Sequence, residues 1–360
     1  MKRNLFLFLT FFLVFYSNAQ ISQDYSLEGL SKVCLYYYEV SSFHDGRAIV
    51  KNVKLGEDGY EKVYGVIDKE GNEIVPCSYN FISSYHEGMA QVKKKGKFGF
   101  INTKGKEIIP CMYDETNLFS EGVAAVKRGN KWGYVDSLGK EVLPCVYSTA
   151  YDFSEGLACV YKPNGPNGYI NKQGKMVLQQ TGGVFSEGLA VKDDTKFIDK
   201  TGKIVFKVET EVHQCGEFSE GLAFVQKDWC YGYIDKSGHL VIPITYSEAK
   251  NFSEGLASVK KGQCGELDIE GKGRYGYIDK KGEVVVPFIY KWGSSFNEGV
   301  AAVKKADSEK SEYIFIDKIG KQIFPLVFDE ACGFSEGLAA VKRGDKWGYV
   351  DKNGKCSLDF

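Results

Sequence analysis

An acidic residue recurs at one place in a repeated motif, and carboxylates are common catalytic groups. The motif FSEGLA and its variants occur nine times, beginning at Phe43, Tyr85, Phe119, Phe153, Phe185, Phe218, Phe252, Phe296 and Phe334. Its acids include Glu121, Glu155, Glu187, Glu220, Glu254 and Glu336. An active site needs a few groups that their environments make unlike one another. A residue that recurs in every unit is therefore interpreted as structural, and the sequence predicts no catalytic residue.

Metal and cofactor motifs are also missing from the sequence. No CxxC, HExxH, P-loop or GxSxG pattern occurs, and the four histidines are spread along the chain. His44 and His86 occupy the same place in neighbouring units, where solvated turn residues are favoured over a shared metal ion. We expect no metal site and no cofactor.

The ten cysteines divide by their place in the repeat. Cys77, Cys111 and Cys145 each follow a proline, where other units carry large apolar residues, so we interpret them as small buried apolar side chains. Cys230 and Cys264 each lie twelve residues after a motif phenylalanine in adjacent units. A bridge between these two is one alternative and two free thiols the other; the remaining five give no pairing pattern.

Two further patterns complete the repeat. GYIDKxG follows each FSEGLA copy, as in Gly133–Gly139, and an apolar pair with a proline and an aromatic residue comes next, as in VLPCVY. The alternation in GLAxV predicts a strand whose alanine and valine face a core, and DKxG is typical of a tight turn with a bulge. Proline lacks an N–H and belongs at a strand end or sheet edge. Each unit is predicted to form three short antiparallel strands.

The string KWGYVD at Lys131 and Lys346, between FSEGxAxVKR and a glycine turn, resembles the bacterial WG (KWG) repeat family. The resemblance covers roughly residues 37–360, although only Trp132 and Trp347 supply the tryptophan. It implies an array that serves as an envelope or interaction module.

The predicted fold is all-β: about nine three-stranded antiparallel units in an open, twisted, solenoid-like array. A closed β-propeller is the alternative, less favoured because most units are 32 to 34 residues apart whereas propeller blades usually need about 40 to 50. The units are placed near 37–78, 79–112, 113–146, 147–178, 179–211, 212–245, 246–289, 290–327 and 328–360, after a cap segment at 20–36.

The first 19 residues have the pattern of a secretory signal peptide: Lys2 and Arg3, an apolar core, then Ser17, Asn18 and Ala19. The apolar run is shorter than the roughly 20 residues of a membrane-spanning helix. We expect export to the periplasm or cell surface, with no membrane span after cleavage. Acidic residues slightly outnumber basic ones, which argues against nucleic acid as a partner.

The units differ most in one loop, between the strand valine and the GYID glycine. This segment spans seven residues from Val92 to Gly99, but fifteen from Val50 to Gly65 and seventeen from Val259 to Gly276; unit eight is also longer. Such loops project from one side of an array, and we expect them to bind a partner. The residues selected are Lys54, Glu57, Tyr60, Glu266, Leu267, Asp268, Ile269, Arg274, Asp307, Glu309 and Lys310.

The same side carries many lysines, such as Lys93–Lys95 and Lys127. They suit an acidic envelope polymer, while solubility and edge protection are the simpler interpretation. The sequence thus favours an exported, non-catalytic interaction scaffold that binds a protein or polymer. The alternatives are an envelope enzyme, such as a glycan hydrolase, and a purely structural surface component.

Overall fold

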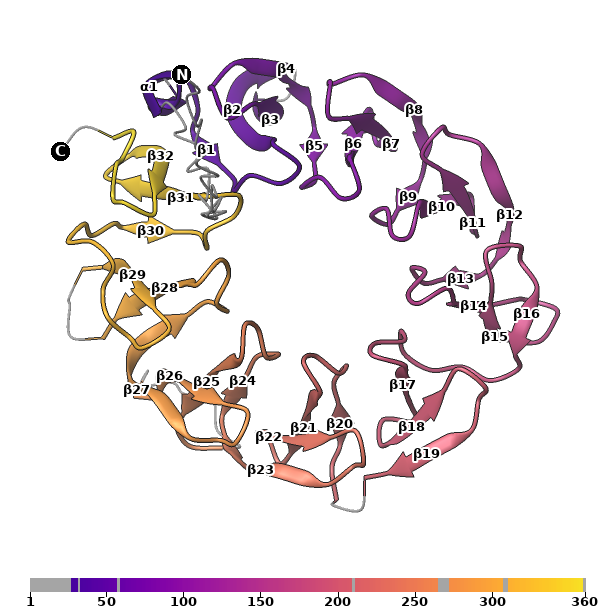
Figure 1. The fold of residues 1–360 in the computed structure, drawn as a ribbon. Helices are drawn as coiled ribbons and strands as arrows, with labels where there is room; N and C mark the ends of the chain where they lie inside the picture. Colours follow the sequence, from indigo (N-terminus) through magenta and orange to yellow (C-terminus); the bar gives the residue numbers. More distant parts are fainter. Residues whose placement is uncertain are drawn as a thin grey trace, which may run out of the picture.

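The computed structural model describes residues 27–31, 33–56, 59–208, 211–264, 272–306 and 310–358. The strands in these ranges form eight antiparallel sheets, which lie around a central axis as a closed β-propeller ring (Figure 1). One sheet is six-stranded and carries two copies of the FSEG motif, so the ring holds nine repeat units. The prediction of an all-β fold is confirmed, but the predicted open array is wrong.

The strands follow the repeat. Two short helices, α1 (Leu27–Leu30) and α2 (Val33–Tyr36), precede the first sheet. Units one to three contain β1 (Glu39–Val40), β2 (Ala48–Gly56), β3 (Gly59–Ile67), β4 (Glu73–Tyr79), β5 (Phe81–Ile82), β6 (Met89–Lys94), β7 (Lys97–Asn102), β8 (Glu107–Tyr113), β9 (Glu115–Thr116), β10 (Val123–Arg128), β11 (Lys131–Asp136) and β12 (Glu141–Tyr147).

Units four to six contain β13 (Thr149–Ala150), β14 (Ala158–Tyr161), β15 (Gly168–Ile170), β16 (Met176–Leu178), β17 (Leu189–Lys192), β18 (Lys196–Asp199), β19 (Ile204–Lys207), β20 (Gln214–Cys215), β21 (Leu222–Lys227), β22 (Cys230–Asp235) and β23 (Leu240–Tyr246). Units seven to nine contain β24 (Glu248–Ala249), β25 (Leu256–Lys261), β26 (Arg274–Asp279), β27 (Val284–Gly293), β28 (Val300–Lys305), β29 (Tyr313–Asp317), β30 (Glu330–Ala331), β31 (Leu338–Arg343) and β32 (Lys346–Asp351).

A two-residue innermost strand explains how so short a unit builds a propeller. The sequence predicted three strands per unit, whereas most sheets have four, because a pair such as Glu115–Thr116 adds to the inner edge of β10. These short strands lie nearest the axis (Figure 1). In the six-stranded sheet, β27 runs on past its proline and its end pairs with β28, joining units seven and eight. Short strands and tight turns thus allow a unit of 32 to 34 residues to form a propeller blade, although its length was the reason for favouring the open array.

The ring closes through contacts of the same kind as those that join neighbouring units elsewhere in it. In mid-ring, the Ser120 hydroxyl donates to the Phe153 carbonyl at 2.7 Å, and the Tyr134 hydroxyl to the Tyr151 carbonyl at 2.6 Å. At the seam, the Ser335 hydroxyl donates to the Phe43 carbonyl and the Tyr349 hydroxyl to the Ser41 carbonyl. Unit nine thus contacts unit one as unit three contacts unit four, which an open array would not show.

The inner strands, such as β10 and β11, are buried on both faces because each sheet lies between two others. Ala124 and Val126 pack with Phe100 of unit two, whereas Ala125 lies on the opposite face of β10 in a cluster with Phe153 of unit four. The predicted core face of the GLAxV strand is therefore correct, but its other face is core as well. The recurring small side chains fit this close stacking of sheets.

The glycine of the WG signature is required by the outer strand. A Cβ on Gly133 would lie 2.6 Å from the Leu143 carbonyl oxygen and 2.7 Å from the Cys145 nitrogen. The register between β11 and β12 shifts between Trp132 and Tyr134, where Gly133 lies, and again between Tyr134 and Val135. Pro144 lies in β12, the last strand of its sheet, as expected for a residue without an N–H.

The N-terminal helices pack beside the seam. Leu27, Leu30 and Val33 join a buried cluster with Trp347 and Tyr349 of unit nine, which also contains residues of unit one. This cluster adds apolar contact area where the chain itself supplies no covalent link between the first and last sheets.

Candidate partner-binding face

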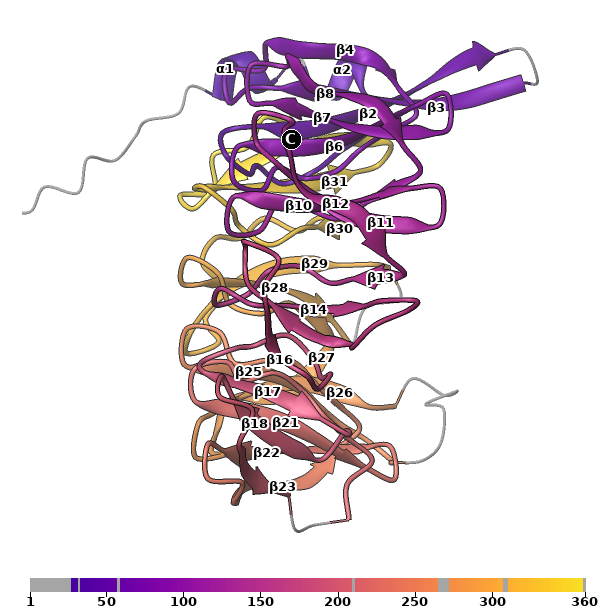
Figure 2. The ribbon, with the colours of Figure 1, turned by 90° about the vertical axis from the view of Figure 1, so that its right-hand side faces the viewer.

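The connections of each unit alternate between the two sides of the ring. The FSEG and DKxG turns lie on one side, here called the turn side. The ends of the hairpins formed by the two central strands of each unit, such as β2 and β3, lie on the other side, here called the hairpin side (Figure 2). In Figure 2 the hairpin formed by β2 and β3 extends beyond the ring on the hairpin side.

On the turn side the recurring glutamates clamp neighbouring units together. The Glu121 carboxylate accepts from the Gly156 N–H of the next unit at 3.0 Å and lies 3.4 Å from the Lys172 ammonium. The same pattern closes the ring, where Glu336 accepts from the Gly46 N–H at 3.0 Å and pairs with Lys69 at 2.9 Å. These acids thus bond backbone of the following unit rather than of their own turn, and recurrence follows from that structural role.

The turns themselves need two residues in the left-handed region. Glu121 has φ of 54° and Gly122 of 83°, while Ser120 and Val123 exchange backbone hydrogen bonds. The conformation is costly for glutamate, and we attribute its retention to the carboxylate's bond across the unit boundary.

The electrostatics of the clamp follow from two opposing effects. Burial alone would raise the pKa of Glu155, but hydrogen bonds from Lys200 and the Gly188 N–H outweigh it and hold the pKa below its ordinary value of 4.5. The pKa values of Glu220, Glu254 and Glu336 are lowered by the same kinds of hydrogen bond. These four carboxylates therefore stay ionised near neutral pH.

On the hairpin side a lysine, an aromatic residue and a glutamate recur together. The Lys127 ammonium lies 5.7 Å from the centre of the Trp132 ring and pairs with Glu115 at 2.6 Å. Equivalent groups are Lys260 with Tyr275 and Glu248, and Lys342 with Trp347 and Glu330. These three hairpin-side lysines are thus each paired with a glutamate of an innermost strand. This pairing weakens the electrostatic case for an acidic polymer.

The candidate partner-binding residues selected from the sequence lie in different environments. Lys54 and Tyr60 lie on the β2–β3 hairpin and Lys310 precedes β29; all three are exposed. Arg274 begins β26 and is half-buried, with its guanidinium donating to the Gly273 carbonyl at 3.1 Å. The others lie outside the described residues: Glu57, Glu266, Leu267, Asp268, Ile269, Asp307 and Glu309.

The β2–β3 hairpin presents apolar side chains to solvent. Tyr60 is 84% exposed and Leu55 76%, and the two are cross-strand partners near its tip. Directly opposed residues share a face of an antiparallel ribbon, as do residues two apart on one strand. Val53 and its partner Lys62 therefore lie on the same face, which continues inward to Lys51 and Tyr64.

A pocket of about 940 Å³ lies at the inner end of that hairpin face, where units nine, one and two meet. Lys51 and Tyr64 line it, together with Tyr38, Phe81 and Trp347. Its charged lining residues are Lys51, Lys342, Glu39, Glu330 and Asp345. Sequence reasoning missed this pocket because it compared loop lengths and not residue types on the innermost strands.

The missed signal was a change of residue type at two equivalent places. Four residues before the motif aromatic, most units have a polar residue such as Glu115 or Glu248, but unit two has Phe81 and unit eight has Trp292. Five residues before it, most have a polar residue such as Asp114 or Ser247, but unit one has Tyr38. Of these departures, Tyr38 and Phe81 line the pocket.

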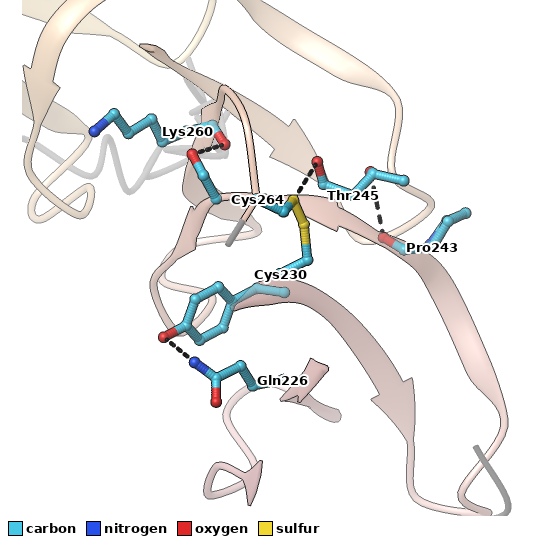
Figure 3. Close-up of a disulfide and its surroundings, with 8 residues drawn as sticks. Gln226, Cys230, Pro243, Thr245, Lys260 and Cys264 are labelled. Carbon is cyan, nitrogen blue, oxygen red and sulfur yellow. Dashed lines mark hydrogen bonds between the residues drawn. A yellow bond between two sulfur atoms is a disulfide. The ribbon is translucent and has the colours of Figure 1, made fainter. Parts of the chain in front are cut away.

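A disulfide joins two units on the hairpin side. Cys230, at the start of β22, is bonded to Cys264 in the connection that follows β25, with 5.2 Å between their Cα atoms (Figure 3). The bridge considered from the sequence is therefore present. It anchors one end of the long unit-seven loop to unit six.

Seven of the described cysteines are free thiols: Cys77, Cys111, Cys145, Cys159, Cys215, Cys332 and Cys356. Cys77, Cys111 and Cys145 are half-buried rather than fully buried, and burial raises the pKa of Cys77 and Cys111 to about 11. Within the described ranges no group of three histidine, cysteine or acidic residues is arranged to hold a metal ion. No helix among the same residues is both long and apolar enough to cross a membrane.

Comparison with protein families gives eight consecutive matches to the WG-containing repeat, at residues 64–98, 98–132, 132–165, 168–191, 197–228, 231–263, 275–307 and 315–347. The chain belongs to the WG-repeat family. No curated protein matches this WG-repeat protein.

Solved structures resemble the WG-repeat chain only in outline. A eukaryotic initiation factor is 13% identical, with 86% of this chain and 80% of the other covered and a TM-score of 0.40. The β-propeller domain of the Trilobed protease from Pyrococcus furiosus is 10% identical over 90% and 98% of the two chains, with a TM-score of 0.40. The WD40 domain of SCAP from fission yeast is 11% identical over 88% and 95%, with a TM-score of 0.32. At these scores the likenesses carry no argument about function.

Proposed function

We propose that this WG-repeat protein is an exported, non-catalytic interaction protein of the bacterial envelope, which binds a protein partner through its hairpin side. The observation that carries the proposal is the β2–β3 hairpin, which projects beyond the ring and exposes Leu55 and Tyr60. Large apolar side chains grouped on a projecting element are typical of protein contacts.

Two features support export. The leader pattern of the first 19 residues is that of secreted proteins. The Cys230–Cys264 bridge suits an oxidising compartment, because disulfides are rare where thiols are kept reduced.

A protein is favoured over an acidic polymer because the hairpin-side lysines are largely engaged. Lys127, Lys260 and Lys342 each pair with a glutamate and lie over an aromatic ring. A polyanion would have to displace those pairs, whereas an apolar partner surface can use Leu55 and Tyr60 directly.

Site-specific photo-crosslinking in the exporting cell tests the proposal. A photoreactive phenylalanine analogue is placed at Tyr60, and in a matched control at Leu138, which is also 84% exposed but lies in a DKxG turn on the turn side. We expect one discrete protein adduct from position 60 and none from position 138, with both forms in the periplasmic or surface fraction. Equal adducts from both positions, no adduct, or retention in the cytoplasm would contradict the proposal.

A further inference from the structure

The pocket where units nine, one and two meet is built from departures within an otherwise regular ring. Tyr38 is 63% exposed and Phe81 36% exposed at positions where the chain elsewhere mostly has polar side chains. Phe81 makes edge contacts with the Tyr64 and Phe98 rings, with centroids 6.1 and 6.3 Å apart, and the Lys51 ammonium lies 5.8 Å from the centre of the Tyr38 ring. Both aromatic rings nevertheless keep part of their surface exposed at the pocket. The two rings are therefore available to a ligand.

The charged side chains of the pocket are three carboxylates and two ammonium groups, so one negative charge is in excess. Lys51 pairs with Glu39 and Lys342 with Glu330, and in both pairs the ammonium side chain is the more covered: 14% against 46% exposed, and 28% against 53%. Asp345 adds a third carboxylate at the exposed β31–β32 turn. Carboxylates beside aromatic rings attract a cationic group, which both can stabilise.

The surface around the pocket has the extent of a peptide site. The face that carries Lys51 and Tyr64 continues along the hairpin through Val53 to Leu55 and Tyr60. β1 pairs only with Val50 and Lys51, so residues 52–56 of β2 have no strand partner on that side within the described chain. An extended segment can lie along such an edge and place alternate side chains on one face.

We propose that this pocket binds an extended peptide segment of a partner protein, with a lysine or arginine beside the Glu39, Glu330 and Asp345 carboxylates and an apolar side chain between Tyr38 and Phe81. The segment continues along the exposed face of the β2–β3 hairpin. The inference rests on the proposed function, since it names the chemistry that the hairpin side recognises.

The test is a selection of random linear heptapeptides, displayed on phage, on the purified full chain. We expect enriched sequences that combine a basic residue with an apolar or aromatic one. The strongest peptide is then synthesised, labelled and titrated by fluorescence anisotropy.

Variants that restore the chain's own consensus identify the site. Phe81→Glu and Tyr38→Ser introduce residues that equivalent positions already carry, and together they should weaken binding about tenfold or more. Trp292→Glu is the matched control, because Trp292 occupies the place of Phe81 in unit eight and should leave affinity within about twofold. Asp345→Lys, in an exposed turn, should also weaken a basic peptide without affecting the melting temperature.

Several outcomes would overturn the inference: acidic or purely apolar consensus sequences, no enrichment, or affinity unchanged in the double variant and in Asp345→Lys. Binding of a neutral oligosaccharide probe such as maltohexaose, lost in the double variant, would assign the pocket to a glycan instead. Crosslinking at Tyr60 tests the proposed function separately. If Tyr60 forms an adduct but the pocket variants leave peptide affinity unchanged, the inference about the pocket is wrong and the proposed function stands. If the pocket variants weaken peptide binding but Tyr60 forms no adduct, the hairpin is not part of the binding surface.

Discussion

The two sides of the ring differ in how closely their units resemble one another. On the turn side, Glu121, Glu155, Glu187, Glu220, Glu254, Glu298 and Glu336 all accept a backbone N–H from the following unit. On the hairpin side, connections range from the tight β6–β7 turn to the long β2–β3 ribbon, and the innermost strands carry anything from Glu115 to Phe81.

The difference separates two kinds of constraint. A group that bonds the following unit must recur, because every unit is followed by one with the same backbone structure. Contacts between the hairpin ends and the following unit, such as the Lys97–Asp114 pair and the Cys230–Cys264 bridge, involve different residues at different junctions. These ends can therefore vary without opening the ring, and a longer loop costs little because closure entropy grows only logarithmically with length. Recurrence thus marks the scaffold and departure marks the surface available to a partner.

The largest expected effect comes from the glycine at which two strands of one unit approach. Gly133→Ala places a methyl group 2.6 Å from the Leu143 carbonyl oxygen, and we expect a loss of about 3 kcal/mol in the free energy of unfolding. Denaturant unfolding followed by circular dichroism measures it.

Gly333→Ala is the matched control, because a Cβ there meets no atom within 4 Å. It should change the free energy of unfolding by less than about 0.5 kcal/mol. Equal losses in both variants would mean that the close approach of β11 and β12 does not explain the WG glycine.

A smaller effect is expected at a turn-side clamp. Glu155→Gln removes the ion pair with Lys200, 2.9 Å away, and weakens the bond to the Gly188 N–H, which should cost about 1 kcal/mol at pH 7. Exposed Glu283→Gln is the control and should be nearly neutral.

The pH dependence of the clamp has a defined sign. The pKa of Glu155 is lowered in the folded chain, so its contribution is present above about pH 4.5 and is lost as the pH falls further. The difference in melting temperature between wild type and Glu155→Gln should therefore shrink as the pH is lowered from about 5 to about 3. A difference that stays constant or grows would show that the carboxylate charge is not what stabilises the junction.

Much of the scaffold was readable from the sequence because it depends on local chemistry. The DKxG turns form as expected: the Gly139 N–H donates to the Asp136 carbonyl and Gly139 has φ of 83°. Pro144 lies on an outermost strand, and the FSEG acids have structural partners. Turn conformation and edge placement are set by a few adjacent residues, so they can be predicted from a single sequence.

Ring closure and the pocket could not be predicted in the same way. Closure depends on the summed rotation of nine units, and no single residue such as Ser335 reveals that its partner will be Phe43. The pocket combines Tyr38 and Phe81 with Trp347 of the last unit, which only closure brings together. A comparison of residue types at equivalent inner-strand positions would have selected Tyr38 and Phe81. It would not have predicted that they lie in one pocket with Trp347 of unit nine.

The smallest expected effect on stability lies at the hairpin tip, and it is the sharpest test of the comparison. Leu55→Ser with Tyr60→Ser removes two side chains that are already exposed in the folded chain, so the free energy of unfolding should change by less than about 0.5 kcal/mol. Capture of the partner identified by crosslinking should nevertheless fall about tenfold or more, because apolar anchors dominate protein contacts. A melting temperature that falls as far as that of Glu155→Gln would place the hairpin tip in the scaffold, and the division between recurring and departing residues would then not separate stability from binding.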